Sequence, residues 1–366
     1  MTIDHREPRP ELYGVPWTTD QFNGMPYRFL GSSGLRVSNV GLGTWKFGYP
    51  ETDDGSRVDE GSALQLLDRA IHLGVTFWDT ANRYNDASGN SERVIGTWME
   101  RNPDQRRNVV LATKLFGGMD GVTPNHSRLS RTNILESVYA SLERLVVDHI
   151  DLLYFHAYDE VTPMEESLAA VEDLARQDLV RYFGVSNFTL DQVSAYRRAT
   201  VADSISRCRV VAVQNRFDVL NGESEQHPGV LAYAAREGIS FVAHGPLAQG
   251  LLSDRYLDLS RTGPGDRLYD EGNLEEGIDE PVMAQVKELA RLADGWDIEL
   301  SQLVLAYTLA LPGMGPVIPG ASSIEQLESN AAAGRITLDE GQRARIQSTL
   351  AATDTSRTEA QRLNPG

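Results

Sequence analysis

Ionisable side chains stand at the ends of three consecutive apolar runs in this chain. The first run ends in Asp79 and is followed five residues later by Tyr84, the second ends in Lys114, and the third ends in His156. A tyrosine beside a lysine, with an aspartate and a histidine in reach, can donate a proton to a substrate. Because the carboxyl ends of parallel strands meet at one rim of a barrel, we expect these four side chains to lie together.

The placement of lysine supports a chemical role at this rim. Lys46, Lys114 and Lys287 are the only lysines, although Lys and Arg together number 34, so a solvated surface cation would be expected to be arginine. Lysine, unlike arginine, can change its protonation state when burial shifts its pKa. Lys114 at the end of a buried strand therefore indicates chemistry, and a strand-end salt bridge is the alternative.

Composition and charge exclude several classes of protein. With 366 residues, 41% hydrophobic and 23% charged, the composition is that of an ordinary globular protein, and no apolar run could span a bilayer. The net charge of −18 argues against a nucleic-acid partner. The single cysteine, Cys208, excludes an internal disulfide and a cysteine-based zinc site, and we expect no metal. We expect a cytoplasmic protein without a signal peptide, which could form a homo-oligomer.

Strand-like and helical patterns alternate along the chain, which predicts βαβ units and a parallel sheet. Strands are expected near 37–42 and over 76–79, 109–114, 150–156, 180–185, 210–214, 240–244 and 315–318. Helices are expected over 61–73, 91–101, 163–177, 189–198, 229–237, 323–332 and 339–350, with a further helix that begins after an N-cap at Ser130 and runs through Leu145. No Gly-x-Gly-x-x-Gly motif follows a strand, so we predict an α/β fold of the (βα)₈ TIM-barrel type rather than a Rossmann fold.

Three segments flank or interrupt the expected single domain, 27–350. A hairpin over 27–30 and 35–37 is expected to plug the bottom of the barrel. A long insertion between strands 7 and 8, 247–280, is rich in Gly, Asp and Pro and is expected to be mobile rather than part of the core. A polar extension, 1–26, precedes the barrel and a flexible tail, 351–366, follows it.

Several motifs coincide with the predicted strand ends, and together they resemble one family. They are Gly41-Leu42-Gly43-Thr44, Asp79-Thr80-Ala81 with Tyr84, Asn90-Ser91-Glu92, Ala112-Thr113-Lys114, Gly184-Val185-Ser186-Asn187-Phe188, Pro246 to Leu252, and Ile318-Pro319-Gly320. The chain resembles an aldo-keto reductase from Tyr27 to about Ala333. Within that family it is similar to the branch of bacterial sugar and glyceraldehyde reductases and potassium-channel β-subunits. The resemblance implies a nicotinamide cofactor and reversible carbonyl reduction.

The resemblance implies a role for each of the four rim residues. Tyr84 would be the general acid and base, and Lys114 would lower the pKa of its phenol. Asp79 would hold Lys114 charged and oriented, and His156 would hydrogen-bond the substrate oxygen. Channel β-subunits often carry Asn at the position of His156, so the histidine favours an active enzyme.

The resemblance also implies a cofactor and its contacts. Ser186, Asn187 and Gln214 match positions that bond the nicotinamide carboxamide, and Phe217 matches an aromatic that stacks on the ring. Arg255 and Arg267 match basic positions that hold the 2′-phosphate, so NADP is expected in preference to NAD. Further cofactor contacts are expected at Gly43, Thr44, Trp45, Asp79, Gly245, Pro246, Leu247, Gln249, Gly250, Ile318, Gly320, Ser322, Gln326 and Asn330. Substrate contacts are expected at Trp45, Tyr49, Trp78, Tyr84, Phe116 and His156.

Three functions are compatible with these residues. The first is an NAD(P)-dependent reductase or dehydrogenase of sugars or small aldehydes. The second is a cofactor-sensing regulatory protein that resembles a channel β-subunit, and the third is a Schiff-base aldolase that uses Lys114. His244 replaces a more usual serine at a strand end, and the sequence assigns it no role.

Overall fold

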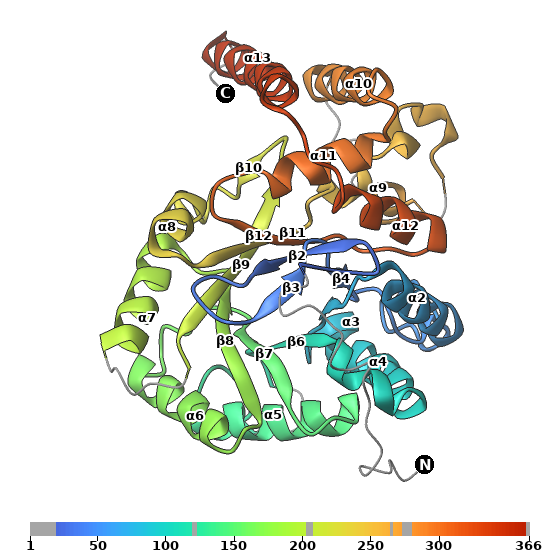
Figure 1. Ribbon diagram of the computed structural model, residues 1–366. Helices are drawn as coiled ribbons and strands as arrows, with labels where there is room; N and C mark the ends of the chain where they lie inside the picture. The colour runs from blue at the N-terminus through green and yellow to red at the C-terminus, as the bar shows by residue number, and fades with distance from the viewer. Residues whose placement is uncertain (1–19, 119–122, 203–207, 264–265, 273–279, 364–366) are drawn as a thin grey trace.

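Eight parallel strands form a barrel in the computed structural model (Figure 1). The structure describes residues 20–118, 123–202, 208–263, 266–272 and 280–363, apart from the side chains at 202, 261 and 352–363. In order around the barrel, the strands are β4 (Leu42–Gly43), β5 (Phe77–Asp79), β6 (Val110–Leu115), β7 (Ile150–Phe155), β8 (Val180–Ser186), β9 (Val210–Asp218), β11 (Ser240–His244) and β12 (Met314–Ile318). Backbone hydrogen bonds from Gly41 N to Val317 O (2.9 Å) and from Gly43 N to Pro319 O (3.1 Å) close β4 onto β12. The predicted (βα)₈ barrel is confirmed.

Helices surround the barrel, as Figure 1 shows. They are α2 (Glu60–Leu73), α4 (Asn90–Arg101), α5 (Arg131–Leu145), α6 (Met164–Arg176), α7 (Leu190–Ala202), α8 (Val230–Glu237), α11 (Leu300–Leu309) and α12 (Ile324–Ala333). The expected N-cap is confirmed, because Ser130 Oγ accepts a hydrogen bond from Asn133 N at 3.3 Å. Within the described residues, no helix has the length and apolar character needed to cross a membrane.

The predicted hairpin covers one end of the barrel (Figure 1). It comprises β1 (Gln21–Phe22), β2 (Met25–Phe29) and β3 (Arg36–Ser38), which pair antiparallel. Its residues Leu30 and Val37 join the apolar cluster inside the barrel. Gly31, at φ +58°, lies so close to β9 that an added Cβ would stand 2.3 Å from the Val211 carbonyl oxygen. The hairpin therefore fills the bottom of the barrel, as expected.

The bounds of two elements, the strand predicted near 37–42 and the last helix, differ from the predictions. The apolar run at 37–42 contains two short strands rather than one, because Arg36–Ser38 pairs with the hairpin and only Leu42–Gly43 enters the barrel. The last helix, α13 (Glu340–Leu363), continues past 350 into the segment expected to be a tail, and no Gly or Pro lies between Ala351 and Leu363 to end it. In Figure 1, α13 lies beside α10 (Glu280–Asp294).

The segment between β11 and β12 has more structure than the sequence indicated. Its described residues form η3 (Ala248–Gly250), η4 (Asp254–Tyr256), η5 (Leu259–Arg261) and α9 (Arg267–Asp270), and Leu252, Tyr256 and Leu268 are buried. The expectation that this segment lies outside the core is therefore wrong for these three residues. Helices α10 and α11 were not predicted. Two further elements, α3 (Tyr84–Ala87) and β10 (Gly222–Glu223), are too short to show a periodic pattern in the sequence and were also not predicted.

Candidate active site

Three adjacent strands bring the four predicted catalytic residues to the rim formed by the carboxyl ends of the barrel strands. Asp79 is the last residue of β5, Lys114 is the penultimate residue of β6, and His156 directly follows β7. Tyr84 opens α3, a single turn that follows β5. The four residues that were grouped because of their positions at predicted strand ends therefore lie together at this rim.

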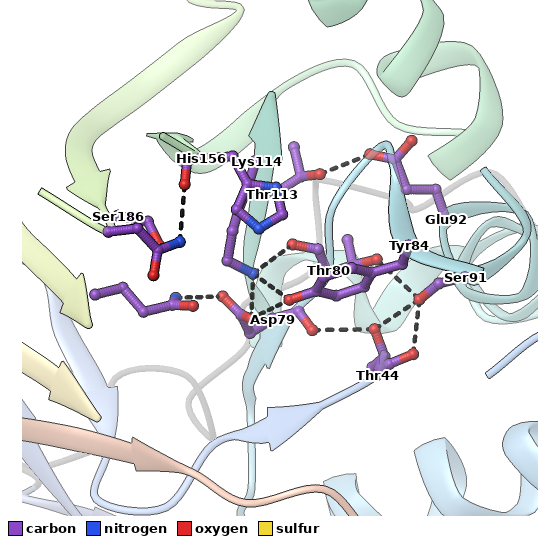
Figure 2. Close-up of polar contacts among 12 residues, drawn as sticks. Thr44, Asp79, Thr80, Tyr84, Ser91, Glu92, Thr113, Lys114, His156 and Ser186 are labelled. Carbon is purple, nitrogen blue, oxygen red and sulfur yellow. Dashed lines mark hydrogen bonds and ion pairs between the residues drawn. The ribbon is translucent and has the colours of Figure 1, made fainter. Parts of the chain in front are cut away.

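Lys114 lies at the centre of this group (Figure 2). Its Nζ donates to Asp79 Oδ1 at 2.5 Å, to the Thr80 carbonyl oxygen at 2.9 Å and to Tyr84 Oη at 2.6 Å. An ammonium has three N–H groups, and these three contacts use all of them. The side chains of Lys114 and Asp79 are only 1% and 3% exposed. A buried ion pair is thus oriented toward one phenol oxygen.

The phenol hydrogen of Tyr84 has no strong acceptor among the described residues. Because Lys114 donates to the phenol oxygen, the hydroxyl hydrogen must point elsewhere, and Asp79 Oδ1 lies 3.4 Å from that oxygen. A contact of this length is a weak hydrogen bond. The second oxygen of Asp79 accepts a bond from Gln214 Nε2 at 2.8 Å. The phenol hydrogen is therefore available to a ligand.

The electrostatics keep Tyr84 protonated at neutral pH. Burial, reinforced by the negative charge of Asp79, raises the pKa of Tyr84 well above its usual range. Burial and Asp79 set this net direction, so the expected lowering of the phenol pKa by Lys114 stays a prediction. Burial lowers the pKa of Lys114, and Asp79 opposes that shift. The pair can still stabilise a phenolate once the proton has left, since Lys114 lies 2.6 Å from the oxygen that gains the charge.

Two neutral imidazoles lie near Lys114. Burial and the charge of Lys114 lower the pKa of His156 to about 3, and the same two causes lower that of His244 to about 3. The rings of Tyr84 and His156 meet edge to face, with centroids 6.0 Å apart. Within the described part of the chain, the His156 imidazole has no hydrogen-bond partner. It can therefore bind a substrate oxygen next to the phenol of Tyr84.

The residues expected at the nicotinamide lie at the neighbouring strand ends. Asn187 Nδ2 donates to the His156 carbonyl oxygen at 2.9 Å and contacts Ser186 Oγ at 3.3 Å. Gln214 donates to Asp79, as described above. Phe217, by contrast, is only 7% exposed and packs edge to face against Phe241 of β11. Its stacking role stays a prediction.

The predicted cofactor residues after β11 and β12 line the adjacent part of the rim. Gln249, at φ +59°, has a buried side-chain oxygen, Oε1, without a hydrogen-bond partner. At the start of α12, Ser322 N and Oγ donate to Gln326 Oε1 at 2.8 and 3.0 Å, and Asn330 Nδ2 donates to the Gly320 carbonyl oxygen at 3.3 Å. Of the other predicted cofactor residues, Gly245, Pro246, Leu247 and Gly250 follow β11, Ile318 ends β12, and Gly43 and Thr44 lie at the end of β4.

The two arginines expected at the 2′-phosphate are each paired with an acid. Arg255 Nε contacts Asp266 Oδ1 at 2.6 Å, and Arg267 Nε contacts Glu271 Oε1 at 3.0 Å. The Arg267 guanidinium also lies 4.6 Å from the ring centroid of Trp45, which follows β4. The segment after β11 therefore reaches the loop after β4. A phosphate bound by either arginine would have to compete with these carboxylates.

The expected substrate residues divide into different environments. Trp45 is 40% exposed, with its ring centroid 6.5 Å from that of Tyr84. Trp78 is fully buried against Trp98 of α4, which corrects the expectation that it lines the cleft, because successive strand residues point to opposite faces. Tyr49 donates its hydroxyl to Glu60 of α2, and Phe116 is half-buried against the core. Substrate contacts at Tyr49 and Phe116 stay predictions.

Comparisons with known proteins agree with this geometry. A model of the aldo/keto reductase family matches residues 39–351. An uncharacterized oxidoreductase of Bacillus subtilis (strain 168) is 33% identical over 86% of this chain and 93% of its own length. A probable voltage-gated potassium channel subunit beta of Oryza sativa subsp. japonica is 31% identical over 84% of this chain and 90% of its own length. The versiconal hemiacetal acetate reductase of Aspergillus parasiticus is 29% identical over 86% and 94%, respectively. The chain belongs to the aldo/keto reductase family.

Proposed function

We propose that this protein is an NAD(P)-dependent oxidoreductase that reversibly reduces the carbonyl of a sugar or small aldehyde, with Tyr84 as general acid and base. The observation that carries the proposal is the 2.6 Å contact between Lys114 Nζ and Tyr84 Oη within a buried ion pair. A proton donor with an oriented cation behind it suits an oxygen that gains negative charge. We further propose that the protein acts in the cytoplasm, which suits its single cysteine.

Aldo-keto reductases use nicotinamide cofactors, and the rim of this chain fits such a group. The unpartnered buried oxygen of Gln249 calls for a polar ligand, since an unpaired buried acceptor is unfavourable. Ser186, Asn187 and Gln214 would hold the carboxamide, and the polar start of α12 would hold the adenosine end. When bound, the cofactor supplies the hydride.

The chain's own residues supply the proton and the orientation. His156, which is neutral, would hydrogen-bond the carbonyl oxygen and hold it against Tyr84. As the carbonyl carbon accepts the hydride, the O–H bond of Tyr84 breaks and its proton passes to the substrate oxygen. The phenolate left behind is stabilised by Lys114, whose charge Asp79 holds in place. In the reverse direction, the phenolate accepts the alcohol proton.

Two alternatives make different predictions about Lys114 and turnover. The kinship with channel subunits favours a cofactor-sensing binding protein as the second candidate. A Schiff-base aldolase is disfavoured, because three donated hydrogen bonds favour the ammonium form of Lys114, which has no lone pair for attack.

Turnover on an aldehyde panel separates the first two candidates. We expect NADPH oxidation with glyceraldehyde, simple sugars or 4-nitrobenzaldehyde, with a kcat on the order of 1–10 s⁻¹ for the best substrate. The decrease in NADPH absorbance would be followed at saturating cofactor, with reactions lacking aldehyde as the control. Tight cofactor binding without turnover on any panel member would favour the binding protein.

Replacing Arg267 tests the preference for NADP. Arg267→Ala should weaken binding of NADP more than binding of NAD, by about 1–3 kcal/mol, because a charge-assisted bond to the 2′-phosphate is lost. Both dissociation constants can be measured by quenching of tryptophan fluorescence. The matched variant Glu271→Gln should strengthen NADP binding, since it releases Arg267 from its 3.0 Å contact. Equal losses for both cofactors would assign Arg267 to the pyrophosphate, and no loss would refute the preference.

A further inference from the structure

A second set of polar residues lies directly behind the catalytic group. Three threonines, one near the carboxyl end of each of three adjacent strands, converge on the first turn of α4. They are Thr44 after β4, Thr80 after β5 and Thr113 within β6. The two residues that receive them, Ser91 and Glu92, are fully buried. We call Ser91 and Glu92 the α4 anchor, which Figure 2 shows beside the catalytic residues.

Ser91 ties the ends of β4 and β5 together. Its Oγ lies 2.8 Å from Thr44 Oγ1 and 2.9 Å from Thr80 Oγ1, and it donates to the Thr44 carbonyl oxygen at 2.8 Å. Thr44 Oγ1 in turn donates to the carbonyl oxygen of Asp79 at 3.0 Å. One arrangement uses each hydroxyl proton once: Thr80 donates to Ser91, Ser91 to the Thr44 carbonyl, and Thr44 to the Asp79 carbonyl. The backbone of a catalytic residue is thereby fixed.

Glu92 holds the next strand, β6. Its Oε1 accepts from Thr113 Oγ1 at 2.6 Å, and its Oε2 accepts from Arg144 Nε at 2.7 Å and from Ser141 Oγ at 3.2 Å. Both oxygens of this buried carboxylate are satisfied, and the bond to Thr113 is short because its acceptor is charged. Thr113 directly precedes Lys114. Since alternate strand residues face opposite sides, Glu92 holds β6 from the helix side while Lys114 points into the site.

The segment that carries Tyr84 begins after Thr80 and ends before Ser91, and a hydrogen bond between these two residues holds its ends together. Thr80 and Ser91 bond to each other across the turn, and Tyr84 lies between them. Three consecutive residues of that turn, Asn85 to Ala87, have left-handed φ values of 57°, 55° and 62°. Asn and Asp adopt this region more readily than other residues, but for Ala87 it is unfavourable and persists only where the surroundings fix it. The position of Tyr84 therefore depends on where the ends of the turn are held.

We propose that Ser91 and Glu92 are positioning residues of the reaction, which set the contact between Tyr84 and Lys114 by fixing the ends of β4, β5 and β6. This inference rests on the proposed function. It assigns the anchor an effect on hydride and proton transfer beyond its contribution to stability. Misplacement of reacting groups by about 1 Å can lower a rate on the order of 100-fold.

Replacement of Thr113 tests the proposal without removing a catalytic group. Thr113→Val keeps the shape of the side chain and the ion pair between Glu92 and Arg144, but removes the bond to the anchor. We expect kcat to fall about 10- to 100-fold while the dissociation constant of NADPH stays within about twofold. Thr113→Ser, which keeps the hydroxyl, should restore most of the rate.

The matched control is Thr308→Val. Thr308 is fully buried in α11, and among the described residues its hydroxyl bonds only within that helix, to the Val304 carbonyl oxygen at 2.8 Å. The Thr308→Val variant should be less stable than the wild type. Its kcat, measured well below the unfolding temperature, should be unchanged. Wild-type kcat in Thr113→Val, or equal losses in Thr113→Val and Thr308→Val, would overturn the proposal.

A crystal structure of Thr113→Val separates this inference from the proposed function. We expect the distance from Lys114 Nζ to Tyr84 Oη to increase from 2.6 Å to beyond hydrogen-bond range, above about 3.5 Å. An unchanged distance would overturn the positioning role, whatever the kinetics. Failure of the proposed function would look different, because the wild-type protein would then turn over no aldehyde, or Tyr84→Phe would retain full activity.

Discussion

Tyr84→Phe should abolish turnover while leaving cofactor binding intact. The substitution removes one oxygen atom, and with it the hydroxyl that Lys114 contacts at 2.6 Å. General acid catalysis typically contributes about 10²–10⁴-fold, so we expect kcat to fall by at least that factor. The rate would be measured as NADPH oxidation with the fastest aldehyde of the panel. NADPH binding, measured by fluorescence, should remain near that of the wild type, because the aromatic ring is retained.

The comparison can be made at neutral pH, where neither Tyr84 nor His156 titrates. Burial raises the pKa of Tyr84 and lowers that of His156 to about 3, so the first stays protonated and the second neutral. Tyr139→Phe is a suitable control, since Tyr139 is 46% exposed on the outer helix α5. Turnover near the wild-type rate in Tyr84→Phe would end the assignment of Tyr84 as the acid.

The sequence predicted which residues share the rim, because that information is local. Asp79, Lys114 and His156 each end an apolar run, and the barrel rule brings such ends together. Trp78 could have been excluded by the same local logic. If Asp79 points into the barrel, its neighbour must point outward toward the helices.

The sequence could not supply the contacts between distant segments. The i,i+4 spacing of Arg267 and Glu271 is a local signal for their pairing, but nothing near Arg267 indicates that its guanidinium covers Trp45 after β4. The motif Asn90-Ser91-Glu92 was recognised, but its partners are threonines from three separate strands. Such contacts depend on the register of the barrel and on where each helix begins, which no local pattern encodes.

Segments without a Gly or Pro to mark where an element ends were also hard to predict. The run at 37–42 has no Gly or Pro before Gly41, so its division between hairpin and barrel is invisible in the sequence. Helix α10 shows the opposite case, because Val282, Val286, Leu289 and Ala293 follow the helical period and are buried. There the signal was present directly after the expected insertion, 247–280, but no helix was predicted from it.

Lys114→Met should be about as inactive as Tyr84→Phe, because the phenolate loses the cation that stabilises it. The substitution also leaves Asp79 buried without its ion-pair partner, which we expect to destabilise the fold by about 3–5 kcal/mol. Stability and chemistry can be separated with the double variant Asp79→Asn/Lys114→Met, which removes the unpaired charge.

The double variant should regain most of the lost melting temperature and none of the lost activity. Lys287→Met, an exposed lysine on α10, is the matched control and should change neither property. Recovery of turnover together with stability would mean that Lys114 supports the fold rather than the proton transfer. Trapping of an aldehyde or ketone on Lys114 by borohydride in the wild-type protein would instead favour an aldolase. The three hydrogen bonds donated by its ammonium argue against that outcome, since a nucleophilic amine must first lose one of the three protons that these bonds hold.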